Sequence, residues 1–353
     1  MELENILKAK KERFSPPTPN FKDSSILITG AGGSIGSELS RQILLKKPKN
    51  LYILDSSEIS LFEILNNLTE IKVSRKIKTK VSPILVNLCE KNILEDYFEN
   101  VRLDFIYHSA AYKHVNLVEE NNFSALKNNL LSTKNLLDIA VKKSQNFLLI
   151  STDKAVHPIN FMGFSKKLCE VMVNDFAKKN IACNFNIVRF GNVLHSSGSV
   201  IPIFEKQIEE NKSITVTDKN ATRFFMTIPE AVSLVIGSSS LKSNGKKYVL
   251  DMGRPVKILD LALQMIKISG FSPCFGKPSP GEIQIKFIGI RKGEKIHESL
   301  TSGSLKKTSI DGIHLVEEKI EKLQINKIID LLKKKLTKES KERILKLIMN
   351  AKT

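Results

Sequence analysis

The sequence predicts an α/β protein in which a doubly wound parallel sheet is followed by a smaller C-terminal part. Short apolar runs alternate with stretches whose apolar residues recur at helical spacing, as in β-α-β units. A glycine-rich turn follows the first apolar run at residues 30–36, and an amphipathic helical stripe follows the turn. The chain has 353 residues, enough for one large domain and a smaller one.

Composition argues against several classes of protein. No apolar run approaches the roughly 18 residues that a membrane span needs, so we expect no integral membrane segment. The four cysteines are scattered without C-x-x-C spacing, which favours buried thiols in a reducing cytoplasm and no metal site. The net charge of +18 would suit nucleic acid or anionic substrates. Much of it is dispersed lysine, so we favour a solvated surface and expect no nucleic-acid partner.

Residues 26–29 form the first expected strand, and they lead directly into the glycines of the turn. Glycines at this spacing let the backbone bend tightly and approach a pyrophosphate, which lies on the N-terminus of the following helix. A strand before the glycines and a helix after them predict a Rossmann-like dinucleotide-binding domain. The expected cofactor contacts of this turn are Gly30, Gly33, Ser34, Ile35 and Gly36.

Residues 51–54 form the second expected strand, which ends at Asp55. An acid at this place accepts hydrogen bonds from the adenosine ribose and repels a 2′-phosphate. No Arg or Lys follows in residues 56–58, so we expect NAD in preference to NADP. The next two strands, expected at residues 84–88 and from residue 105, end in further cofactor contacts. These are Asn87, Leu88, Ala110 and Ala111.

The segment after the fifth strand carries the candidate catalytic residues. Residues 147–150 read as a buried parallel strand, and Thr152, Asp153 and Lys154 follow its end. Open α/β sheets bind their ligands at such strand ends. Met162 and Lys166 lie four residues apart on the next expected helix and therefore share one face of it.

These segments together resemble the extended short-chain dehydrogenase/reductase superfamily, in which a Ser or Thr follows strand five and a Tyr-x-x-x-Lys pair lies on the next helix. Thr152 and Lys166 match that pattern, and Met162 stands where the Tyr belongs. The acid–lysine pair after Thr152, together with the Met, resembles one branch, the nucleotide-sugar 4,6-dehydratases of bacterial polysaccharide and glycan biosynthesis. The resemblance covers residues 22–300 and implies that Lys166 holds the nicotinamide ribose.

The implied reaction is NAD-dependent 4,6-dehydration of a UDP-sugar, with UDP-N-acetylglucosamine as the first choice. Hydride passes from sugar C4 to the nicotinamide, water is lost across C5 and C6, and the hydride returns to C6. We assign Lys154 as the base at C5, Asp153 as the acid at C6 and Thr152 as the hydrogen-bond partner of O4. Met162 cannot take a proton, so either Asp153 or a water must deprotonate the 4-hydroxyl.

The resemblance also implies substrate-binding residues, most of them in the C-terminal half. Two arginines are expected at the diphosphate because a guanidinium pairs bidentately with phosphate oxygens. Departures from the family pattern at His195, Ser197 and His157 lie on the substrate side and leave the exact sugar nucleotide open. The expected substrate contacts are Lys113, His114, Asn192, Ser199, Gln207, Thr217, Arg223, Met252, Arg291 and Glu294.

The sequence leaves several alternative functions open. A 5-inverting dehydratase and a nucleotide-sugar epimerase would use the same scaffold, and a cofactor-binding sensor without catalysis would suit the missing Tyr. Residues 2–7 resemble the lead-in to the soluble half of long, membrane-anchored relatives, so we expect either a soluble form or a piece of such a protein. A homo-oligomer is also expected. The expected organisation is an N-terminal helix and linker (1–21), a dinucleotide-binding domain (22–190), an interleaved nucleotide-sugar-binding part (191–310) and C-terminal helices (311–353).

Overall fold

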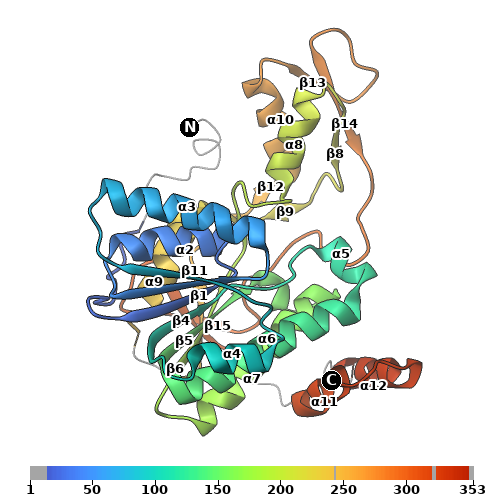
Figure 1. Cartoon of the computed structure of the whole chain (residues 1–353). Helices are drawn as coiled ribbons and strands as arrows, with labels where there is room; N and C mark the ends of the chain where they lie inside the picture. Colours follow the sequence, from blue (N-terminus) through green and yellow to red (C-terminus); the bar gives the residue numbers. More distant parts are fainter. Residues whose placement is uncertain (1–13, 242–243, 320–322, 350–353) are drawn as a thin grey trace.

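A nine-stranded sheet lies at the centre of the computed structural model, which describes residues 14–241, 244–319 and 323–349 (Figure 1). Its strands are β1 (Ser25–Thr29), β2 (Asn50–Asp55), β3 (Lys80–Leu85), β4 (Leu103–His108), β5 (Ser144–Thr152), β6 (Asn184–Phe190), β11 (Lys246–Leu250), β15 (Ser304–Lys307) and β16 (Ile313–Glu317). Their order is β15-β16-β11-β6-β5-β4-β1-β2-β3. Neighbours from β3 to β11 are parallel, while β16 and β15 are antiparallel. This is the order of a doubly wound dinucleotide-binding sheet, so the predicted fold class is confirmed.

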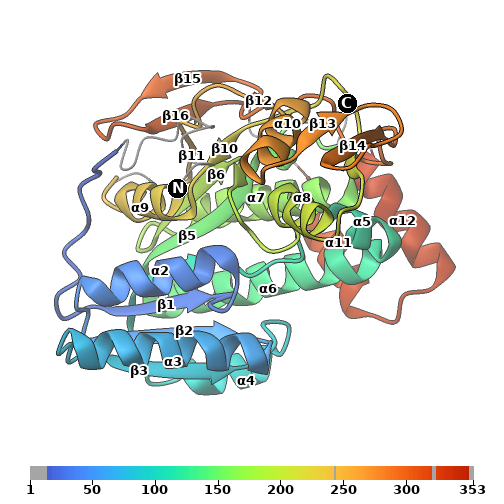
Figure 2. The ribbon, with the colours of Figure 1, turned by 90° about the horizontal axis from the view of Figure 1, so that it is seen from above.

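Helices cover both faces of the sheet (Figures 1 and 2). One face carries α2 (Ser34–Leu45), α3 (Glu58–Ser74) and α9 (Ile228–Ser238), and the other carries α4 (Lys91–Phe98), α6 (Asn122–Lys143) and α7 (Phe161–Lys179). Burial on both faces explains why β1 and β5 contain uninterrupted apolar runs, at residues 26–28 and 147–150.

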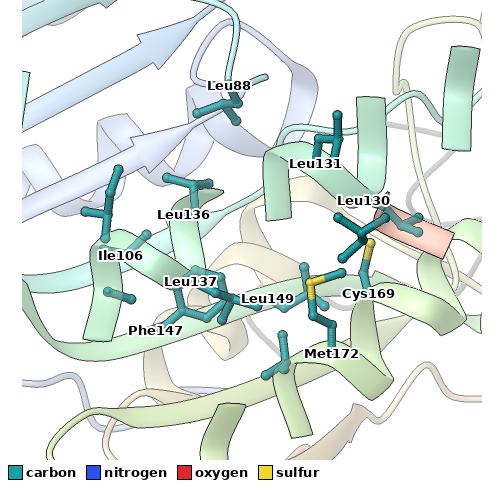
Figure 3. Close-up of a cluster of buried hydrophobic side chains, with 14 of the residues drawn as sticks. Leu88, Ile106, Leu130, Leu131, Leu136, Leu137, Phe147, Leu149, Cys169 and Met172 are labelled. Carbon is teal, nitrogen blue, oxygen red and sulfur yellow. The ribbon is translucent and has the colours of Figure 1, made fainter. Parts of the chain in front are cut away.

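The core beneath α6 and α7 fixes the strand that ends at the candidate catalytic segment. Leu136 and Leu137 of α6, Phe147 and Leu149 of β5, and Met172 of α7 meet there and are each at most 3% exposed (Figure 3). Burying a side chain of this size stabilises the fold by roughly 1.5–3 kcal/mol. The end of β5 is therefore held by a rigid interior.

Two C-terminal helices, α11 (Ile325–Lys333) and α12 (Lys338–Met349), lie beside α6 and extend this core (Figures 1 and 2). Ile328, Ile329 and Leu332 of α11 are buried, as the recurrence of apolar residues from Ile320 to Leu332 in the sequence predicts. Ile320 lies outside the described residues, as do residues 1–13 of the expected N-terminal helix and linker.

The smaller part has an apolar core of its own. It contains α8 (Val200–Glu209), α10 (Ile258–Ile268) and a sheet of β8 (Ile214–Val216), β13 (Ser272–Cys274) and β14 (Glu282–Phe287). Two short pairs join it to the large domain: β7 (Asn192–Val193) with β10 (Phe225–Met226), and β9 (Thr222–Arg223) with β12 (Val256–Lys257). In Figure 1 this part stands above the carboxyl edge of the sheet.

Two boundaries differ from the prediction. The region after residue 311, expected to be helical, begins with β16, which pairs with β11 and β15 before the helices start at Ile325. Its Ile-x-Leu-Val composition suits a strand paired on both sides. The third strand ends at Leu85 and not at Leu88, because Asn87 turns the chain: its Oδ1 accepts from Cys89 N at 2.9 Å.

Four charged side chains form a buried group, the closed cluster, consisting of Glu170 of α7, Arg189 of β6, Lys247 of β11 and Glu318. Arg189 donates to both carboxylate oxygens of Glu170 (2.7 and 2.5 Å) and to both carboxylate oxygens of Glu318 (3.0 and 2.9 Å). Lys247 pairs with both glutamates. Burial alone would raise the pKa of Glu170, but Arg189 and Lys247 outweigh it and lower that pKa to about 2. Ser151 donates to Glu170 at 2.6 Å and so ties the cluster to the strand that ends at Thr152.

Candidate active site

A cavity of about 1000 Å³ opens at the carboxyl ends of the central strands. Its place and size fit a ligand site of an open α/β sheet. Most of the predicted site residues line it. They are Gly30, Gly33, Ser34, Ile35, Gly36, Asp55, Asn87, Leu88, Ala110, Ala111, Lys113, His114, Thr152, Lys154, Met162, Lys166, Asn192 and Ser199.

The glycine turn between β1 and α2 forms one end of the cavity. Gly30 has φ +65°, and a Cβ there would lie 2.8 Å from the backbone of Ala110. A Cβ at Gly36 would lie 1.9 Å from Gly30 O, so the first turn of α2 packs too closely for any side chain. The N-terminus of α2 therefore points its free backbone N–H groups into the cavity, as pyrophosphate binding requires.

Asp55 lies at the end of β2 beside this turn. Its Oδ2 accepts from Gly32 N at 2.9 Å and its Oδ1 accepts from Ser57 N at 3.0 Å. The carboxylate is thereby fixed at the cavity wall, with lone pairs left for a ribose diol. In the described residues, the wall next to it continues with Ser56, Ser57 and Ser60, none of which is basic.

Lys166 lies on α7 and is 6% exposed. Burial lowers the pKa of Lys166 from its usual value, while Cys169 and Glu170 partly counteract that shift. Behind it, His108 is held between Thr29 Oγ1 (2.9 Å) and Thr133 Oγ1 (3.0 Å). Burial, with a smaller effect of Lys166, lowers the pKa of His108 to about 3, so this ring is neutral.

Thr152, Asp153 and Lys154 form a short hydrogen-bonded group at the end of β5. Thr152 Oγ1 donates to Asp153 Oδ1 at 2.8 Å, and Lys154 Nζ donates to the same oxygen at 3.0 Å. Lys154 Nζ also donates to Asn192 Oδ1 at 3.1 Å. Asp153 itself is 0% exposed and lies one layer behind the cavity wall, whereas Thr152 and Lys154 lie in the wall. Asp153 Oδ2 has no hydrogen-bond partner among the described residues.

Met162 occupies the start of α7, where a buried apolar group forms with Val118 and Ala125. The side chain is 4% exposed and lines the cavity. The helix begins here because Asn160 caps it, its Oδ1 accepting from Gly163 N at 2.7 Å. Met162 thus packs the site and offers no proton donor or acceptor of use.

Seven predicted residues do not line the cavity within the described residues. Thr217 Oγ1 donates to Glu294 Oε1 (3.3 Å), and Arg223 pairs with the same carboxylate at 2.9 Å. Arg223 also donates to the backbone oxygens of Thr222 (2.7 Å) and Ile296 (3.0 Å). Its guanidinium is therefore engaged by the protein. The residues outside the wall are Asp153, Gln207, Thr217, Arg223, Met252, Arg291 and Glu294.

A loop at residues 195–199 reaches over the cavity to the glycine turn. Ser197 N donates to Ser34 Oγ at 3.2 Å, which brings the substrate half against the start of α2. Gly198 has φ +71°, and a Cβ there would lie 2.4 Å from the His114 ring. Burial, then the nearby Lys113, lowers the pKa of His114.

The stretch of residues 291–298, here called the strap, contains two site residues that the sequence analysis did not name, Lys295 and Glu298. Glu298 Oε1 lies 3.7 Å from Lys154 Nζ, and Glu298 Oε2 lies 3.6 Å from Lys295 Nζ. The only sequence signal was their position in the same short charged segment as Glu294. The contact between Lys154 and Glu298 joins residues far apart in the sequence, so it can be recognised only in the folded structure.

Within the described residues no group of His, Cys, Asp and Glu has the geometry of a metal site. Among those residues, too, no helix combines the length and hydropathy that crossing a bilayer requires.

Comparison with known sequences places the chain in a family of polysaccharide biosynthesis proteins. The family model described as "Polysaccharide biosynthesis protein" matches residues 26–318. The capsular polysaccharide biosynthesis protein CapD of Staphylococcus aureus is 40% identical, and the match covers 98% of this chain and 58% of CapD. The chain thus spans little more than half of that relative's length. The UDP-glucose 4-epimerase of Rickettsia bellii is 34% identical over 80% of this chain and 79% of its own.

Solved structures share the fold. Pen from Bacillus thuringiensis superposes with a TM-score of 0.73 at 29% identity, covering 84% of this chain and 87% of Pen. DesIV of Streptomyces venezuelae, a dTDP-glucose 4,6-dehydratase solved with NAD bound, has a TM-score of 0.64 at 18% identity, covering 78% and 88%. With its glycine turn, its Thr152-Asp153-Lys154 group and a match over most of its length, the chain belongs to the polysaccharide biosynthesis protein family, a group of nucleotide-sugar dehydratases and epimerases within the extended short-chain dehydrogenase/reductases.

Proposed function

We propose that the chain catalyses the 4,6-dehydration of a nucleotide sugar, UDP-N-acetylglucosamine first among them, with NAD as the cofactor. The observation that carries this proposal is the acid–lysine pair at the end of β5: Asp153 and Lys154 share one hydrogen bond beside Thr152. Dehydration needs a base at C5 and an acid at C6, whereas epimerisation at C4 needs neither. A pair of this kind at the cavity wall supports the first reaction.

The residues around the glycine turn fit NAD. The turn leaves space only for backbone, the start of α2 supplies N–H groups for a pyrophosphate, and Asp55 suits an unphosphorylated ribose. When bound, NAD supplies the acceptor for hydride from the sugar and returns that hydride later in the reaction. Lys166, at the other end of the cavity, would hold the nicotinamide ribose.

The hydrogen bonds at the end of β5 suggest the path of each proton. Thr152 Oγ1 would bind the sugar O4, and its existing bond to Asp153 offers the 4-hydroxyl proton a route to that carboxylate. Lys154, as a neutral amine, would then remove the C5 proton and return a proton there once C6 has received its hydride. Asp153, which lies behind the wall, would hold the 4-hydroxyl proton on its carboxylate, whose Oδ2 bonds to no described residue, and would return it to the departing 6-hydroxyl by way of Thr152. Met162 would take no part in proton transfer and would shape the wall.

The substrate's nucleotide end would enter from the smaller part. Arg223 and Arg291 remain the proposed diphosphate ligands, with Asn192, Ser199, Gln207, Thr217 and Met252 as further contacts. Arg223 would exchange its bond to Glu294 for phosphate oxygens, which would free Glu294 for the nucleoside ribose. A homo-oligomer also stays a prediction.

Epimerisation at C4 is the second candidate, favoured by the 34% identity to a UDP-glucose 4-epimerase. One incubation separates the two. The purified protein is given NAD and UDP-N-acetylglucosamine in deuterated water, and the product is followed by mass spectrometry and NMR. Loss of one water with deuterium at C5 supports dehydration, and the C5 geometry distinguishes retention from inversion. A C4 epimer of unchanged composition would establish epimerisation, and an unchanged sugar would reject this substrate.

A further inference from the structure

Glu298 is a buried carboxylate beside the proposed base, and the proton path above does not use it. Its side chain is 4% exposed, and its Oε1 lies 3.7 Å from Lys154 Nζ. Its Oε2 lies 3.6 Å from Lys295 Nζ but has no hydrogen-bond partner in the described part of the chain. Buried carboxylates are nearly always fully hydrogen-bonded, so the incomplete hydrogen bonding of Glu298 calls for an explanation.

Two hydrogen bonds dock the strap on the catalytic segment just ahead of Glu298. Lys295 Nζ donates to Val156 O at 2.7 Å, and Asn160 Nδ2 donates to Gly293 O at 2.7 Å. Gly293 has φ +79°, and a Cβ there would lie 2.9 Å from the Asn160 Cβ, so the strap lies directly on the catalytic segment. The carboxylate is thus carried from the smaller part to Lys154 by a firmly docked backbone.

Lys154 Nζ has three oxygen neighbours and, as an ammonium, three protons to donate. The neighbours are Asp153 Oδ1 at 3.0 Å, Asn192 Oδ1 at 3.1 Å and Glu298 Oε1 at 3.7 Å. Only two of them carry charge. In the proposed reaction Asp153 takes up a proton and becomes neutral, and Lys154 takes the C5 proton as a neutral amine. Glu298 is then the charged partner of the ammonium that forms.

We propose that Glu298 is a positioning residue for Lys154. It holds the amine between Asp153 and Asn192 and supplies the counter-charge of the lysine while Asp153 carries a proton. The role of Glu298 in catalysis rests on the proposed function, whereas its contact with Lys154 rests on geometry alone. Asp153 can therefore change its protonation without releasing Lys154 from its place.

Kinetics test the catalytic meaning. Glu298→Gln, which keeps the shape and removes the charge, is expected to lower kcat about 10- to 100-fold with KM within about threefold, because a misplaced base costs rate more than binding. Glu298→Asp, which restores the charge on a shorter arm, should recover part of that loss. The matched control is Glu318→Gln, the same change in the closed cluster, which should lower Tm and leave kcat unchanged. A Glu298→Gln enzyme with wild-type kcat, or an Asp variant no better than Gln, would overturn the role.

A second measurement needs no substrate and no cofactor. The protein is treated with acetic anhydride, and acetylation of Lys154 is timed by peptide mass spectrometry against Lys113 as the internal reference. Glu298→Gln should speed the acetylation of Lys154 severalfold, since the amine loses a charged partner, while Glu318→Gln should leave it unchanged. An unaltered rate would show that Glu298 does not hold Lys154. If the wild type leaves UDP-N-acetylglucosamine unconverted, the proposed function fails while this measurement still decides the contact.

Discussion

Two charged groups in this molecule each contain two acidic and two basic side chains, but they differ in how completely those side chains are hydrogen-bonded. The closed cluster holds two glutamates, an arginine and a lysine, and the site cluster holds Asp153, Glu298, Lys154 and Lys295. In the closed cluster the arginine reaches all four carboxylate oxygens at 2.5–3.0 Å. In the site cluster the contacts of Glu298 are 3.6 and 3.7 Å, and one oxygen of each acid lacks a hydrogen bond within the described residues.

Charge composition alone therefore does not determine whether a buried cluster stabilises the fold or takes part in the reaction. A fully hydrogen-bonded network has one arrangement and resists change. A buried carboxylate oxygen without a partner costs roughly 1–3 kcal/mol, and such a cost persists where the oxygen is needed for a ligand or a proton. The closed cluster is therefore expected to respond to mutation in stability, and the site cluster in activity.

The largest expected effect is the loss of activity in Asp153→Asn. An amide at this place cannot take up the 4-hydroxyl proton or protonate the departing 6-hydroxyl, so kcat should fall at least about 1000-fold, or about 4 kcal/mol. Product formation is followed by mass spectrometry, and Tm should stay within a few degrees of the wild type. Wild-type turnover in this variant would break the assignment of the site cluster to chemistry.

The next effect is on stability. Arg189→Leu leaves two buried glutamates without their shared partner, and removing one member of such a pair costs about 3–5 kcal/mol of unfolding free energy. Urea unfolding measures the change. Lys306→Ala is the control: it breaks an ion pair with Glu317 in which the two side chains are 64% and 42% exposed, so it should cost less than about 1 kcal/mol. An equal loss of unfolding free energy in Arg189→Leu and Lys306→Ala would show that the closed cluster stabilises the fold no more than an exposed ion pair does.

The closed cluster should also set the acid limit of the fold. Burial alone would raise the pKa of Glu318, but its hydrogen bonds and charge contacts with Arg189 and Lys247 lower that pKa to about 2, as they do for Glu170. A depressed carboxylate pKa stabilises the fold fully above the ordinary value near 4.5, and the benefit is lost as pH falls toward 2. Tm measured from pH 7 to pH 3 should drop mainly below 4.5, and the drop should be shallower in Glu318→Gln.

The smallest effect is expected from Met162→Leu. The side chain packs against Val118 and Ala125 and transfers no proton, and a Leu of similar volume costs less than about 1.5 kcal/mol. We expect kcat within about threefold of the wild type in the dehydration assay. A large loss would mean that the sulfur contributes to the chemistry, and the wall of the site cluster would need a new assignment.

Much of the fold could be predicted from sequence because its signals are local. The buried strands are short apolar runs, and the glycine turn is readable from residue types alone. The identities of the cavity residues followed from the strand ends at Asp55 and Thr152. β16 was missed because a strand of only five residues near a lysine-rich helical region gives a weak pattern.

The arrangement of the two clusters could not be predicted. Glu298 meets Lys154 only because the strap crosses from the smaller part, and nothing local to residue 298 indicates that contact. Likewise, sequence reasoning named Asp153 but could not tell that its side chain lies behind the cavity wall. Both facts depend on tertiary packing, which brings residue 298 to residue 154 and residue 191 to residue 153.

The late position of Glu318 has a consequence for how the chain is made. Glu318, the second carboxylate partner of Arg189, lies 129 residues later in the sequence. At about 5–20 residues per second, the ribosome needs roughly 6–26 s to synthesise that stretch. Once β11 has been synthesised, it lies at the open edge of the sheet until β16 emerges from the ribosome. Ribosome-bound chains stalled before residue 313 should thus hold the glycine turn and β5 in place, yet expose a strand edge and an excess buried cation to chaperones.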